Sequence, residues 1–129
     1  MEAEALVAAA LSSIPRAQVA ALIDLSSGML LAVEPAPDDT STLDLIAATV
    51  KEIFEGDLAQ GLQLPSPTPD GDQSIKVLVA AGDEALRVMV RMHAQPNLVL
   101  AVFCPVHSNL GMCLVKARNL AMTHTVEGI

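Results

Sequence analysis

Two short stretches carry residue types that do chemistry in other proteins. The first, DLSSG from Asp24 to Gly28, holds an acid, two hydroxyls and a glycine. Such a set can build a nucleophile loop, a phosphate cradle or a tight turn. A nucleophile elbow needs Gly-x-Ser-x-Gly before a helix, and a P-loop needs Gly-x-x-x-x-Gly-Lys-Ser/Thr. Neither pattern is present, and the histidines offer no recognisable base motif for Ser26. The pattern therefore favours a turn between two strands.

The second stretch, CPVH from Cys104 to His107, pairs a thiol with an imidazole. It has the residue types of a thiolate site or of half a zinc site. The other ligands would have to be Cys113, His93 and His124, and none of these spacings matches a known zinc cluster. A cysteine that ends a buried strand is more often a small hydrophobic residue. We therefore expect no catalytic residue, no metal and no cofactor.

The charges are separated along the chain. Lys51 is the only cation among the acids between residues 34 and 72, whereas five cations lie between residues 76 and 118. This separation indicates either two solvated faces or a polarised surface that steers a partner. The net charge of −8 and the near absence of aromatic residues exclude the usual modes of nucleic-acid binding.

The composition bounds the class of protein. The chain has 129 residues and is 52% hydrophobic, which predicts one domain over residues 1–129. No apolar run reaches the roughly 18 residues of a membrane span, so we expect no membrane insertion. Glu2 and Glu4 stand where a signal peptide carries positive charge. The two cysteines are too few for a disulfide framework. These features predict a cytoplasmic protein.

The apolar spacing predicts the elements that position these residues. A first helix carries an apolar stripe from Ala3 to Ile14, and a middle helix starts near Ser41, with Asp44 at capping-box spacing, and stops at Gly56. In the final helix, Leu110, Cys113, Leu114, Ala117 and Ala121 are expected to point inward. The predicted order of elements begins with a helix before residue 15, strands at 18–25 and 28–33, and the middle helix. A proline-rich loop at 64–72 follows, and then strands at 74–80, 85–93 and 98–104 and a helix from residue 108. Short links between strands predict antiparallel pairing and an α+β fold.

Three stretches resemble the roadblock family of dynein-light-chain-like domains. They are the hairpin ALIDLSSGMLLA, the capped helix STLDLIAATVKEIFEGD, and the strand and helix LVLAVFCPVHSNLGMCLVKARNLAM. The resemblance covers residues 3–124. It implies a five-stranded antiparallel sheet of the roadblock, longin and profilin type, in the order α-β-β-α-β-β-β-α. The middle helix would cover one face and the outer helices the other.

The resemblance also implies a homodimer in which the third strands pair edge to edge and the middle helices lie side by side. The third strand is apolar on most of both faces, and an exposed edge of that kind invites pairing. On the middle helix, three uncharged residues lie away from the inner stripe. The expected dimer interface is Leu45, Ala48, Thr49, Ile75, Val77, Leu78 and Val79.

Dimers of this family are platforms for small Ras-like GTPases. In bacteria they act in polarity or motility switches, and other members of the family are scaffolds. The resemblance implies a GTPase partner, which we expect to meet acidic Glu52 and Glu55. Arg16 is the only loop-like arginine. Any stimulation of hydrolysis would therefore come from holding the switch segments of the GTPase and not from an arginine finger.

A PAS-like or profilin-like sensor is the alternative, since it shares a central antiparallel sheet flanked by helices. A sensor needs a ligand pocket with a few convergent polar groups. The strands offer few polar residues that point inward. An enzyme ranks third.

Overall fold

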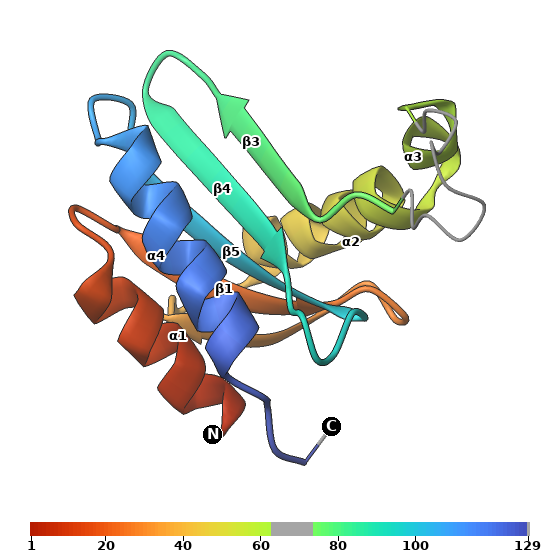
Figure 1. The fold of residues 1–129 in the computed structure, drawn as a ribbon, viewed down its shortest axis with the longest axis horizontal. Coiled ribbons are helices and arrows are strands. Elements are labelled where there is room, and N and C mark those ends of the chain that lie inside the picture. The colour runs from red at the N-terminus through yellow and green to blue at the C-terminus, as the bar shows by residue number, and fades with distance from the viewer. Residues whose placement is uncertain (63–73, 129) are drawn as a thin grey trace.

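The chain alternates short helices with the strands of one antiparallel sheet (Figure 1). The computed structural model describes residues 1–62 and 74–128, so the loop expected at 64–72 lies outside the described residues. The elements are α1 (Ala3–Ser13), β1 (Val19–Asp24), β2 (Met29–Glu34), α2 (Ser41–Glu55), α3 (Asp57–Leu62), β3 (Val77–Ala81), β4 (Ala85–Arg91), β5 (Leu98–Pro105) and α4 (Leu110–Thr123).

The five strands form a sheet in the order β2-β1-β5-β4-β3, and every pair is antiparallel. Leu22 of β1 lies opposite Leu100 of β5, and Val88 of β4 lies opposite Val102 of β5. Strand β5 is central and buried on both faces from Leu98 to Val102, which explains its unbroken apolar run. The predicted five-stranded antiparallel α+β fold is confirmed, and β2 and β3 form its two edges.

Helices cover the two faces unequally. In Figure 1, α1 and α4 lie side by side on one face, and α2 lies on the other. The core under α1 and α4 includes Leu6, Leu22 and Leu100. A smaller core under α2 is centred on Phe54 and Val99. Within the described residues, no helix is long and apolar enough to cross a bilayer.

Helix α2 has the predicted bounds, but its first turn is capped differently. Asp39 accepts a hydrogen bond from the backbone N–H of Ser41 at 2.9 Å, and the hydroxyl of Thr40 donates to Asp44 at 3.0 Å. Thr40 occupies the N-cap position, so the expected pairing of Ser41 with Asp44 is wrong by one residue.

Other local predictions also need correction. Helix α4 starts at Leu110 because Asn109 is its N-cap, with its side-chain oxygen accepting from the N–H of Met112 at 3.0 Å. Leu110 is 41% exposed, so the prediction that it points inward is wrong. Strand β3 starts at Val77 instead of Ser74. Helix α3 is absent from the prediction. Gly56 ends α2 as expected, but the chain turns directly into this second, short helix.

Candidate functional site

The stretch from Asp24 to Gly28 is a turn between β1 and β2, as predicted. The Asp24 carboxylate accepts hydrogen bonds from the N–H of Ser26 at 3.0 Å, the hydroxyl of Ser26 at 2.6 Å and that of Ser27 at 3.0 Å. The Ser26 hydroxyl contributes most to holding the pKa of Asp24 below its usual value. Gly28 has φ +72°, a conformation that favours glycine. These hydroxyls serve the turn.

The Cys104 and His107 side chains belong to different environments. Cys104 is buried, with its sulfur 3.8 Å from that of Cys113, whereas His107 is exposed. Burial is the largest contribution that raises the pKa of the Cys104 thiol, to about 12, so the thiol stays protonated near neutral pH. Among the described residues, no three His, Cys, Asp or Glu side chains could hold a metal ion. The two cysteines therefore act as packing residues of the core.

An apolar groove runs along α2, on the face of the sheet that this helix covers. Helix α2 packs over β1 and β2, and the groove of about 330 Å³ opens between the helix and the other half of the sheet. Leu45 stands on its rim with 69% of its surface exposed. The walls come from one helix and three strands: Leu45, Ile46, Thr49, Val50, Ile53, Leu78, Ala80, Arg87, Met89 and Phe103. An unfilled apolar groove of this kind is typical of an interaction surface.

The structure brings together only part of the expected dimer interface. Leu45, Thr49 and Leu78 line the groove, and Ile75 packs against the same core although it precedes β3. The remaining three residues lie elsewhere.

Val77 packs against the core under α1 and α4, and Val79, two residues along the strand, shares its face. Ala48 lies beside the β1–β2 turn, since a Cβ atom added to Gly28 would come within 3.8 Å of the Ala48 Cα. The seven expected interface residues therefore lie on both faces of the sheet, and the interface they form stays a prediction. Val77 and Val79 can take part only through the backbone of β3, or from the opposite face. In the described part of the chain, the outer edge of β3 pairs with no other strand.

Arg91 is the feature that sequence reasoning missed. It is only 7% exposed and sits at the end of the groove face of β4. Its guanidinium donates to Glu55 Oε1, to the carbonyl of Pro96 (both 2.9 Å) and, through Nε, to the carbonyl of Ile75 at 2.8 Å. The same group lies 5.3 Å above the ring of Phe54. Arg91 thus ties the end of α2 to the segment just before β3 and to the β4–β5 turn.

The Arg91 contacts change the interpretation of the two predicted partner-binding acids. Glu55 makes an internal ion pair and has 42% of its side chain exposed, so charge reversal there would disturb the fold as well as the surface. Glu52 is exposed and its side chain folds over Gly56 at the end of α2. Glu52 is therefore the cleaner probe of partner binding.

Arg16 lies in the connection from α1 to β1, as expected. It is exposed and has φ +63°, a left-handed backbone conformation that is uncommon outside glycine. The connection follows α1, which covers the opposite face of the sheet from α2. Arg16 is not among the residues that line the groove.

The arrangement of a five-stranded antiparallel sheet with two helices on one face and one on the other matches solved roadblock/LC7 structures. Solved structures with this fold include a Roadblock/LC7 domain from Streptomyces avermitilis, at 17% identity and TM-score 0.70 over 94% of this chain and 92% of that one. MglB from Myxococcus xanthus is similar at 17% identity and TM-score 0.70, over 92% and 87% of the two chains. The gliding protein MglB from Thermus thermophilus matches at 20% identity and TM-score 0.68, over 92% and 82%.

No family model and no curated protein matches the sequence. The structural similarity, at these low sequence identities, shows a shared fold. That fold agrees with the resemblance seen in the sequence.

Proposed function

We propose that this chain is a non-catalytic homodimeric interaction module that binds and regulates, or scaffolds, a small Ras-like GTPase. The observation that carries the proposal is the apolar groove along α2, with exposed Leu45 on its rim and the edge strand β3 beside it. An exposed apolar groove next to an unpaired strand edge supports association with a second protein chain.

A second copy fits this surface by symmetry. In a two-fold dimer, the same patch lies on both sides of the interface, so Leu45 of each copy would enter the groove of the other. Pairing of the two β3 edges would extend the sheet and satisfy their free backbone groups. The dimer would bury Leu45, Thr49 and Leu78 and would bring the two α2 helices together.

The paired α2 helices would then offer an acidic surface to the partner. Asp44 and Glu52 are exposed on α2, and Asp57 follows at the start of α3. Acidic side chains around an apolar seam steer a cationic surface of a GTPase toward it. The family resemblance supports the GTPase as that partner, in a bacterial polarity or motility system. The protein would act by holding the switch segments of the GTPase, without supplying a catalytic residue.

The first experiment tests the dimer. Light scattering should show a dimer for the wild type at tens of micromolar, which registers a dissociation constant of about 1 µM. Leu45→Glu should give a monomer, because two charges would be buried at the interface. Val115→Glu is the matched control, since Val115 is 65% exposed on α4, on the opposite face of the sheet. A wild-type monomer, or a dimer unaffected by Leu45→Glu, would refute the proposed interface.

The second experiment tests the partner. Small GTPases of the host, loaded with a GTP analogue or with GDP, are titrated against the protein. We expect tighter binding of one nucleotide state, and we expect Glu52→Lys to weaken it and its salt dependence. Glu4→Lys on α1 is the control, because it makes the same charge change on the opposite face. Equal affinity for both nucleotide states would exclude a regulator of the GTPase switch and leave only a scaffold function. No binding to any GTPase would refute the proposed partner.

A further inference from the structure

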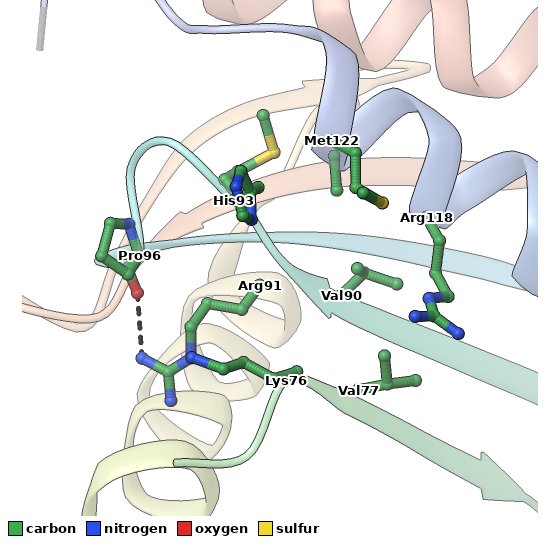
Figure 2. A pocket seen from close by; sticks show the side chains of 10 residues that line it. Lys76, Val77, Val90, Arg91, His93, Pro96, Arg118 and Met122 are labelled. Atoms are coloured by element: carbon green, nitrogen blue, oxygen red, sulfur yellow. Dashed lines mark hydrogen bonds between the residues drawn. The ribbon is translucent and has the colours of Figure 1, made fainter. Parts of the chain in front are cut away.

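A second pocket lies on the opposite face of the sheet, between the C-terminal half of α4 and strands β3 and β4 (Figure 2). Its volume is about 220 Å³. Val90, Met92 and Ala121 form a buried apolar floor, and Val77 and Met122 form its sides. This pocket shares no lining residue with the groove along α2.

Two exposed cations, Lys76 and Arg118, border the apolar floor. Arg118 reaches from α4 toward Val90 and Val77, while His93 lies at the other end of the pocket (Figure 2). Arg118 is exposed and makes no hydrogen bond or ion pair within residues 1–62 and 74–128. The guanidinium of Arg91 is held by Glu55 and Pro96, so Arg91 gives the pocket a wall and not a free charge. Arg118 can therefore bind an anion, and Lys76, which is also exposed and lines the pocket, adds a second positive charge to its border.

The size of the pocket limits what can enter it. Sites for drug-sized ligands and cofactors occupy about 300–1,000 Å³, so this pocket suits a single aliphatic side chain. Outside the pocket, Met122 (61% exposed) and Val115 (65% exposed) continue an apolar ridge along the outer side of α4. A ligand longer than one side chain would therefore find further apolar contact along the helix.

We infer that this pocket is a docking site for an acidic peptide segment of a partner protein, which inserts one aliphatic side chain and places a carboxylate on Arg118. Charge supports this occupant. The chain carries a net charge of −8, so the cationic rim is a local exception that selects acidic segments against the general repulsion. Arginine binds a carboxylate through two parallel hydrogen bonds, which fixes the register of the segment.

The site would operate beside the proposed dimer without depending on it. Val77 belongs to the edge strand β3, so pairing of two β3 edges would place one pocket on each side of the seam, on the face away from α2. One dimer could therefore bind a GTPase on the α2 face and two acidic segments on the α4 face.

The test uses nuclear magnetic resonance on the ¹⁵N-labelled full chain with the peptide acetyl-Asp-Glu-Leu-Asp-Glu-amide. We expect saturable shifts at the amides of Val77, Val90, Ala121 and Met122. Replacing the central leucine of the peptide with serine should abolish the shifts. Replacing its acids with the corresponding amides should weaken binding roughly tenfold, which is the usual worth of a charge-assisted hydrogen bond.

Two variants of the protein make the same change of charge on α4. Arg118→Glu should weaken binding roughly tenfold or more, whereas Lys116→Glu, which lies outside the pocket, should change it less than about threefold. Equal effects of the two variants would overturn the site, as would the absence of saturable shifts in the millimolar range. Octanoate is the last comparison, and binding of octanoate in the pocket without binding of the peptide would overturn the assignment to a peptide.

Discussion

The two faces of the sheet are covered in different ways. Beneath α1 and α4, two helices enclose a large apolar core in which Leu6, Leu22 and Leu100 have no exposed surface. On the other face, α2 alone covers β1 and β2 and leaves a groove beside β3 and β4. The face with fewer helices has its apolar surface unfilled, and it relies on a buried arginine to hold the end of its helix. The first face therefore holds the larger buried core, while the second leaves apolar surface open beside its single helix.

The largest expected effect is a difference in unfolding free energy between two leucine truncations, one on each face of the sheet. Leu22→Ala should lower the free energy of unfolding by about 3–4 kcal/mol, because the side chain is fully buried and the surrounding core cannot close the cavity. Leu78→Ala in the groove should cost about 1 kcal/mol in the monomer, because that side chain is only half-buried. Urea unfolding in a Leu45→Glu background measures both without the proposed dimer. Equal losses would contradict the comparison.

The next effect concerns the arginine that holds the α2 face. Arg91→Met should cost about 2–3 kcal/mol, because it removes the donor for the carbonyls of Ile75 and Pro96 and leaves the Glu55 charge without its partner. Arg87→Met on the same strand is the control, since Arg87 is exposed. A double-mutant cycle with Glu55→Gln isolates the ion pair. A loss in Arg91→Met no greater than in Arg87→Met would show that the buried contacts contribute little.

The smallest effect lies in the β1–β2 turn. Asp24→Ala should cost about 1 kcal/mol near neutral pH through its lost hydrogen bonds, and Asp38→Ala, an exposed control, should cost less. The folded-state pKa of Asp24 is lowered, so its contribution is present above the unfolded pKa and is lost as pH falls through the folded pKa. Unfolding measured from about pH 7 to about pH 3 should therefore show the variant and the wild type converging in acid. A difference that is constant with pH would assign the loss to packing.

The sequence by itself determined the local elements. Apolar spacing located α2 and the order of helices and strands, and turn chemistry identified the Asp24–Gly28 turn, because these features depend on neighbours a few residues apart. The alternating pattern of β4 also placed Val88 and Val90 on one face, where they join the core under α1 and α4.

Only the tertiary structure decided which distant residues meet. Arg91 is separated by 36 residues from Glu55 and by 16 from Ile75, so no local pattern distinguishes it from exposed Arg87 on the same face of β4. The pleat of β3 sends Leu78 and Val77 to opposite faces, but only the packing shows that Leu78 joins the core under α2 and Val77 the core under α1 and α4. Which side of the sheet α2 covers, and how much of that side it leaves open, depends on packing across the whole fold. That packing creates both the groove along α2 and the pocket beside Arg118.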